Sequence, residues 1–166
     1  MNKIFKVGLI GCGHISETYF RGHDYFNNFQ IIKCADINQE NANKCAETYN
    51  IQACSVEELL KDDEIEIILN LTIPRAHYEV AKQSLEHGKH VYSEKPMAVN
   101  FNEGEELLSL SKSKGLYIGN APDTFLGGGL QKSIDLINQD KIGNVRLGSA
   151  IFAYPGVQSY HPNPEP

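Results

Sequence analysis

The sequence lacks the features that mark membrane, secreted or nucleic-acid-binding chains. No stretch approaches the roughly 18 consecutive apolar residues that a membrane span needs. Lys and Arg, 15 in all, form no run, and 21 Asp and Glu leave the 166-residue chain with a net charge of −6. This balance disfavours nucleic acid and anionic membranes as partners. The first ten residues include Lys3 and Lys6 and have no signal-peptide core, so we expect a cytoplasmic protein.

Cysteine patterns typical of zinc sites and disulfide frameworks are also missing. None of the four cysteines belongs to a Cys-x-x-Cys pair, and no pair of histidines lies near them at zinc-ligand spacing. They are Cys12, Cys34, Cys45 and Cys54. We expect no metal site, and reduced, mostly buried thiols that pack as small apolar side chains. With 41% apolar and 22% charged residues, the chain fits roughly one globular domain.

The sequence does contain a regular alternation of short apolar runs and helical segments. The runs predict strands at residues 4–10, 29–35, 51–54, 65–71, 89–92, 116–118 and 145–152. Helices are expected at residues 13–27, 39–49, from 55, from 74 to just before 88, 100–114 and 130–139, with capping-box spacing at Ser55/Glu58 and Asn100/Glu103. The alternation predicts an α/β fold, a doubly wound parallel sheet of the Rossmann type with strand order 3-2-1-4-5-6.

A Gly-x-Gly-x-x-Ser turn joins the first predicted strand to the first helix. Gly11 permits the tight turn, and Gly13 lets the backbone approach a pyrophosphate at the helix N-terminus. Asp36 ends the second strand, 20 residues after Ser16, where a carboxylate binds the hydroxyls of the adenosine ribose. No Arg lies within residues 37–44 to neutralise a 2′-phosphate, which favours NAD over NADP. The alternative for Asp36 is a surface residue that caps the next helix.

Two further motifs fall at the carboxyl ends of the fourth and fifth predicted strands. Residues 70–74, Asn-Leu-Thr-Ile-Pro, are followed one turn later by His77. The fifth strand leads into Glu94-Lys95-Pro96. A Lys beside a Glu is either an ion pair that holds the ammonium or a proton donor. Each motif alone also fits a structural role, as a strand end before a helix or as a solvated surface pair.

Together these motifs resemble the Gfo/Idh/MocA oxidoreductases over about residues 4–153, above all through Glu94-Lys95-Pro96. Residues 121–127 and 160–165 further resemble one dehydrogenase branch of that family. The resemblance implies that the cofactor is bound by Gly11, Gly13, His14 and Ile15 at its pyrophosphate, by Asp36 at its adenine ribose, and by Leu71, Thr72, Pro74 and His77 at its nicotinamide half, with Glu94 near the nicotinamide ribose. It implies that Lys95, beside the cofactor, is the catalytic residue that orients or protonates the substrate oxygen. Asn120 would lie at the rim of the substrate pocket. The resemblance also implies a cis Lys95–Pro96 bond.

The implied reaction is hydride transfer between NAD and a sugar-like or polyol substrate, with NADP less favoured. Family members are considerably longer, because a second α/β domain covers their nicotinamide and completes the substrate site; we expect that domain to be absent from this chain. We therefore divide the chain into a Rossmann domain (1–120), a crossover helix and strand that lead to the absent domain (121–153), and a loop-like tail (154–166). The open edges of the strand at 145–152 predict a homo-oligomer.

Two other functions fit parts of the pattern. The first is a module that binds a dinucleotide without chemistry, because the covering domain is absent. The second is a methyltransferase, which also pairs a Gly-rich turn with an acidic residue after the second strand. Glu94-Lys95-Pro96 has no role in a methyltransferase, so this function is the weakest of the three.

Overall fold

The computed structural model describes residues 3–23, 25–122, 125–151, 153 and 156. The chain forms two compact units, Met1–Asp123 and Thr124–Pro166. Within the described residues, no helix is both long and apolar enough to cross a membrane. The expected tail at 154–166 lies outside the described residues except for Gly156.

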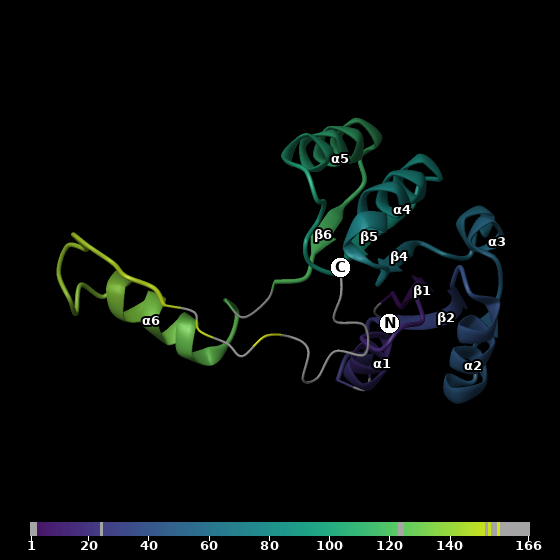
Figure 1. The fold of residues 1–166 in the computed structure, drawn as a ribbon, viewed down its shortest axis with the longest axis horizontal. Helices are drawn as coiled ribbons and strands as arrows, with labels where there is room; N and C mark the ends of the chain where they lie inside the picture. Colours follow the sequence, from purple (N-terminus) through teal and green to yellow (C-terminus); the bar gives the residue numbers. More distant parts are fainter. Residues whose placement is uncertain (1–2, 24, 123–124, 152, 154–155, 157–166) are drawn as a thin grey trace. The chain divides into compact units, whose positions relative to one another are not determined.

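The first unit is built on a six-stranded parallel sheet with the order β3-β2-β1-β4-β5-β6 (Figure 1). Its strands are β1 (Phe5–Ile10), β2 (Phe29–Ala35), β3 (Gln52–Ala53), β4 (Ile67–Asn70), β5 (His90–Ser93) and β6 (Ile118–Asn120). The predicted fold class and strand order are both confirmed. The order reverses its direction between β1 and β4, and ligands of such sheets bind beyond the carboxyl ends of the strands at that point.

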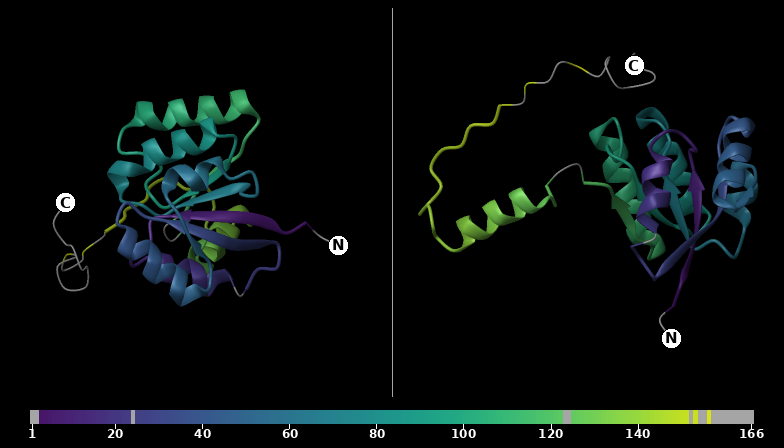
Figure 2. Two further views of the ribbon diagram at one scale, coloured as in Figure 1. Left: turned by 90° about the vertical axis from the view of Figure 1, so that its right-hand side faces the viewer. Right: turned by 90° about the horizontal axis from the view of Figure 1, so that it is seen from below.

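Helices cover both faces of this sheet. They are α1 (Ser16–His23), α2 (Gln39–Tyr49), α3 (Val56–Lys61), α4 (Pro74–Glu86) and α5 (Phe101–Lys114). Figure 2 shows α4 and α5 over one face and α1 and α2 on the other. The buried core correspondingly has two layers. The layer on the side of α1 and α2 consists of Val7, Leu9, Ile31, Cys34, Cys45, Leu69 and Leu71. The layer on the side of α3, α4 and α5 consists of Ile10, Ala35, Leu59, Leu60, Ile65, Ile68, Ala81, Leu85, Val91 and Leu107.

The helix ends follow the local signals of the sequence. Ser55 Oγ accepts the Glu58 N–H at 3.2 Å, and the Glu58 carboxylate accepts the Ser55 N–H at 2.8 Å, so the predicted capping box is confirmed. The carboxylate of Glu103 accepts the N–H of Asn100 at 3.2 Å at the start of α5. Pro74 is the first residue of α4, as its fixed φ favours.

Several predicted boundaries are wrong. The first helix ends at His23 rather than at residue 27, since Asn27 and Asn28 favour a turn. In the second unit, α6 (Gly128–Asn138) replaces the helix expected at 130–139. The strand expected at 145–152 is also wrong: residues 145–151, the part of it that the structure describes, are not in a strand. An extended apolar segment becomes a strand only when a neighbouring strand accepts its ladder hydrogen bonds, and the described part of this unit contains no strand.

An ion pair joins β2 to the loop that precedes β4. Lys33 Nζ donates to Asp62 Oδ2, and the two side chains are only 23% and 18% exposed. The Lys33 ammonium, with a further hydrogen bond from the Glu64 N–H, lowers the pKa of Asp62 below its ordinary value. A lowered carboxyl pKa contributes stability above the unfolded pKa, and this contribution is lost as the pH falls through the folded pKa.

We therefore expect Asp62→Asn to lower the free energy of unfolding by about 1–2 kcal/mol at neutral pH, because one charge-assisted hydrogen bond is lost. The difference from the wild type should shrink in acid, where Asp62 is protonated in both the folded and the unfolded chain. Urea titrations from neutral to acidic pH measure both effects. Asp63→Asn is the matched control on the exposed neighbouring carboxyl. Equal stability of wild type and Asp62→Asn at neutral pH would contradict this role.

Candidate dinucleotide site

The glycine turn between β1 and α1 passes directly over the end of β4. Gly11 has φ of +100°, and a Cβ there would lie 2.6 Å from the carbonyl carbon of Leu71 and 2.7 Å from its oxygen. The Gly11 N–H donates to the Ala35 carbonyl at 2.9 Å, which ties the turn to β2 as well. Only glycine fits this position, because both the backbone conformation and the contact with Leu71 exclude a side chain.

Gly13 occupies a different environment two residues later. A Cβ at Gly13 would meet nothing within 4 Å, so the path to its backbone is open. Ser16, the small residue at the third position of the motif, is buried and donates its hydroxyl to the Gly13 carbonyl at 2.7 Å. Within the described residues, the N–H groups of Gly13, His14 and Ile15 have no hydrogen-bond acceptor. Open N–H groups at a helix N-terminus fit an anion such as a pyrophosphate.

Asp36 lies half-buried just beyond β2 and is hydrogen-bonded to the glycine turn. Its Oδ2 accepts the Cys12 N–H at 2.7 Å, and its Oδ1 accepts the Asn38 N–H at 2.8 Å. The cap of α2 is Asn38, whose side chain accepts the Glu40 N–H. The alternative that Asp36 caps this helix is therefore wrong. Each carboxylate oxygen retains a lone pair that could accept a hydroxyl.

A buried polar network lies at the carboxyl end of β4. Asn70 is fully buried, and its Nδ2 donates to the His77 carbonyl at 3.0 Å and to Ser93 Oγ at 3.2 Å. Its Oδ1 accepts the Thr72 hydroxyl at 2.7 Å. The ring nitrogens of His77, which is 1% exposed, lie 2.5 Å from the Pro96 carbonyl and 2.9 Å from the Thr72 carbonyl. The network thus fastens the loop after β4 to the loop after β5, and it places the His77 ring inside the protein.

The side chain of Glu94, beyond β5, is held by α1. Its Oε1 accepts the Tyr19 hydroxyl at 2.7 Å, and its Oε2 accepts the Lys95 N–H at 3.0 Å. Burial, followed by the hydrogen bond to Glu94, raises the pKa of Tyr19 above its ordinary value. The Lys95–Pro96 bond is cis, as the resemblance implies. Lys95 is exposed, and its Nζ has no partner among the residues that the structure describes, so no Glu94–Lys95 ion pair forms.

Asn120 completes this edge of the sheet from the end of β6. Its Nδ2 donates to the Ser93 carbonyl at 3.0 Å and to the Glu94 carbonyl at 2.8 Å. Asn120 therefore holds the backbone that carries Glu94. Leu71 is buried and meets Gly11 through its carbonyl group, whereas Pro74 is exposed at the start of α4.

Direct contacts bring the sequence motifs to one edge of the sheet. The turn meets β4 at Gly11 and Leu71, α1 meets the loop after β5 at Tyr19 and Glu94, and the loops after β4 and β5 meet at His77. Sequence reasoning did not single out Tyr19. Its position one helical turn beyond the glycine motif is the signal that could have found it.

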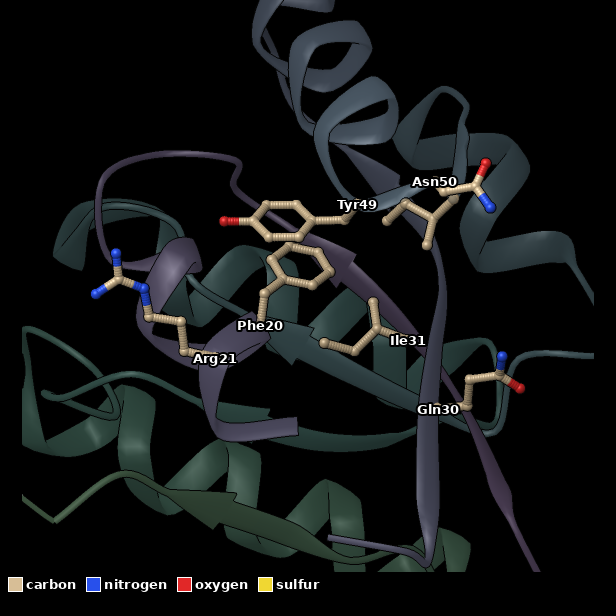
Figure 3. A pocket seen from close by; sticks show the side chains of 7 residues that line it. Phe20, Arg21, Gln30, Ile31, Tyr49 and Asn50 are labelled. Atoms are coloured by element: carbon tan, nitrogen blue, oxygen red, sulfur yellow. The ribbon is translucent and has the colours of Figure 1, made fainter. Parts of the chain in front are cut away.

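The hollow in Figure 3 lies at the other end of the strands and is separate from this site. It has a volume of about 440 Å³ and is lined by Phe20, Arg21, Gln30, Ile31, Tyr49, Asn50 and Ile51. The rings of Phe20 and Tyr49 lie face to face, with centroids 3.7 Å apart. The lining residues come from the start of β2, from the ends of α1 and α2 and from the two residues that follow α2, so the glycine turn is not part of the lining.

Residues 5–121 match the Gfo/Idh/MocA oxidoreductase family, described as having an NAD-binding Rossmann fold. The chain belongs to this family. Trans-1,2-dihydrobenzene-1,2-diol dehydrogenase of Xenopus tropicalis is 29% identical over 159 residues, which cover 93% of this chain and 47% of that protein. Members of this family bind a nicotinamide dinucleotide. The open glycine turn between β1 and α1 agrees with such binding.

Solved structures show the same fold. Biliverdin reductase from Synechocystis sp. PCC 6803, in complex with biliverdin and NADP+, has 29% identity and a TM-score of 0.74, covering 84% of this chain and 44% of that chain. An NAD-binding protein from Listeria innocua has 20% identity and a TM-score of 0.78, covering 84% of this chain and 42% of the other. The chain thus spans less than half the length of each of these relatives.

Proposed function

We propose that this chain is the cofactor-binding half of an NAD-dependent dehydrogenase that acts on a sugar-like or polyol substrate. The observation that carries the proposal is the pairing of the open glycine turn with the Asp36 carboxylate. Gly13 leaves room for the pyrophosphate, and the N–H groups of residues 13–15 have no acceptor among the described residues. Asp36 stands at the end of the neighbouring strand, at the place where a ribose follows a pyrophosphate.

The preference for NAD over NADP rests on charge. Asp36 accepts hydrogen bonds from two ribose hydroxyls, and its carboxylate repels a phosphate at the 2′ position. Residues 37–44 contain no Arg that could neutralise such a phosphate. Ile37, fully exposed beside Asp36, offers an apolar surface to the adenine instead of a charge.

The nicotinamide half is assigned to the loops after β4 and β5. Thr72 and Pro74 border it, and Glu94 is held by Tyr19 and the Lys95 N–H in a position to accept a ribose hydroxyl. The cofactor supplies the carbon that takes or gives the hydride. The exposed ammonium of Lys95 orients the substrate oxygen and moves its proton, because no partner in the described residues engages it. His77 acts as a positioning residue, since its buried ring fixes both loops.

The alternative is a module that binds the dinucleotide without turning over a substrate. The chain spans 47% of the diol dehydrogenase and 44% of the biliverdin reductase. Among the described residues, the substrate side of the site is limited to Lys95 and its neighbours. We therefore assign cofactor binding to this chain alone, and catalysis to the chain together with a covering domain.

Calorimetric titration with NADH and, separately, NADPH tests the proposal. We expect micromolar binding of NADH and much weaker binding of NADPH. We also expect little or no oxidation of polyols by this chain, because Pro74 and Lys95 are exposed at this edge of the sheet, where water would reach the nicotinamide. Binding of neither nucleotide would refute the function. Measurable dehydrogenation that is lost in Lys95→Ala, but kept in the control Lys112→Ala on the exposed end of α5, would show that the chain is itself an enzyme.

A further inference from the structure

Three cysteines converge behind the glycine turn. Cys12 comes from the turn itself, Cys34 from β2 and Cys45 from α2, and their three sulfur atoms lie within 4.8 Å of one another. None of them is in a disulfide. Cys34 and Cys45 are 0% and 7% exposed, whereas Cys12 is half-buried. The cluster therefore has two buried members and one that reaches solvent.

Burial alone explains a single cysteine in a core, because a thiol packs as a small apolar group. It does not explain why three thiols from three elements gather at one point. Cys54 shows the contrast: it is also half-buried, but it packs in the other core cluster, with Ile10 and Leu59, and its Sγ lies outside the group of three. The distinguishing feature of the other three is the convergence of their sulfur atoms.

We propose that Cys12, Cys34 and Cys45 form a binding site for one soft d10 metal ion, of the Cu(I) or Zn(II) class. Metal–thiolate bonds of about 2.3 Å arranged in a plane require sulfur atoms about 4 Å apart, which the cluster reaches with small rotations. Thiolates are the protein ligands that such ions prefer. Within the described residues, no fourth His, Cys, Asp or Glu joins the group. A three-coordinate ion, or one with a water as its fourth ligand, fits this set.

A metal ion can enter this site from solvent, and the protons that it displaces can leave to solvent. Each thiol that becomes a ligand releases its proton to solvent, and no electron is transferred. The half-buried Cys12 is the point at which the ion enters. Because the ligands come from a turn, a strand and a helix, the site exists only in the folded chain, and the ion stabilises the fold. The proposal rests on the cluster geometry and is independent of the proposed dinucleotide function.

Titration of the fully reduced chain with Cd²⁺ under anaerobic conditions tests this site directly. The thiolate-to-cadmium absorption in the ultraviolet reports how many sulfurs bind. We expect saturation at one Cd²⁺ per chain with the intensity of three thiolates, and displacement of the cadmium by Cu(I), which binds thiolates more tightly than Cd²⁺ does. Cys45→Ser and Cys12→Ser should each lose about a third of the absorption and bind at least about tenfold more weakly.

Cys54→Ser is the matched control and should titrate like the wild type. Circular dichroism establishes whether each variant is folded. If Cys45→Ser does not fold, the site is tested with Cys12→Ser, because Cys12 is only half-buried. Three results would overturn the site: no saturation at one equivalent in the wild type, an unchanged titration in Cys12→Ser, or an equal loss in Cys54→Ser. Retention of cadmium against an excess of Cu(I) would also overturn it.

Discussion

Gly13→Ala is expected to weaken NADH binding by at least about 30-fold, or about 2 kcal/mol, while the chain stays folded. A Cβ at Gly13 meets no protein atom within 4 Å, and φ at this position does not lie in the left-handed region, so the folded chain accommodates the methyl group. The same methyl group fills the space through which a pyrophosphate would approach the backbone N–H groups. The substitution should therefore weaken NADH binding without lowering the stability of the fold.

Gly11→Ala is the counterpart with the opposite expected result. Its Cβ would overlap the Leu71 carbonyl at 2.6–2.7 Å, and φ is +100°. Strained backbone costs about 1–3 kcal/mol and overpacking a similar amount, so we expect a loss of about 2–6 kcal/mol in the free energy of unfolding. We therefore expect the two glycines of one motif to serve different purposes, one structural and one for the ligand.

Thermal unfolding and calorimetry on the same preparations separate the two effects. Gly104→Ala is the matched control: it also meets nothing within 4 Å, it lies in α5, and it should leave NADH binding unchanged. NADH affinity of Gly13→Ala equal to that of the wild type would show that the turn has only a structural role. A stable Gly11→Ala would contradict the close approach of the turn to Leu71.

Element ends that are set by local sequence signals could be predicted, whereas the ends of strands that are set by their pairing could not. The Ser55–Glu58 capping box and Pro74 are local signals, and the structure confirms both. The ends of β5 and β6 were expected too early in the chain. Ser93 belongs to β5 because it pairs with Asn70 on one side and Asn120 on the other, and such neighbours are set by the sheet and not by the residue itself.

The same distinction holds for the candidate site. Gly11, Gly13 and Asp36 were found because their spacing along the chain is fixed by one strand–helix–strand unit. The Tyr19–Glu94 hydrogen bond joins residues 75 positions apart, and no local pattern reports it. The cysteine cluster was missed for the same reason: Cys12, Cys34 and Cys45 have no metal-ligand spacing in sequence, and only the packing of β2 and α2 brings them together.

Asp36→Ala is expected to weaken NADH binding by about 1–3 kcal/mol, because two charge-assisted hydrogen bonds to ribose hydroxyls are lost. NADPH binding should not fall in parallel, since the substitution also removes the charge that repels a 2′-phosphate. The ratio of the NADH and NADPH affinities therefore shows whether the charge of Asp36 sets the cofactor preference. Calorimetric titration of each variant with both nucleotides measures it, and Asp63→Ala, on an exposed carboxyl outside the site, is the control.

Asp36 also accepts the N–H groups of Cys12 and Asn38, so its removal could act through the shape of the turn. Asp36→Asn separates the two roles. An amide oxygen still accepts one of these N–H groups, but the side chain carries no charge and presents donors on its other end. If charge sets the cofactor preference, Asp36→Asn and Asp36→Ala should lose NADH selectivity to the same extent, although Asp36→Asn remains the more stable. If the turn geometry alone matters, Asp36→Asn should retain the wild-type selectivity, and unchanged NADH affinity in both variants would remove Asp36 from the site.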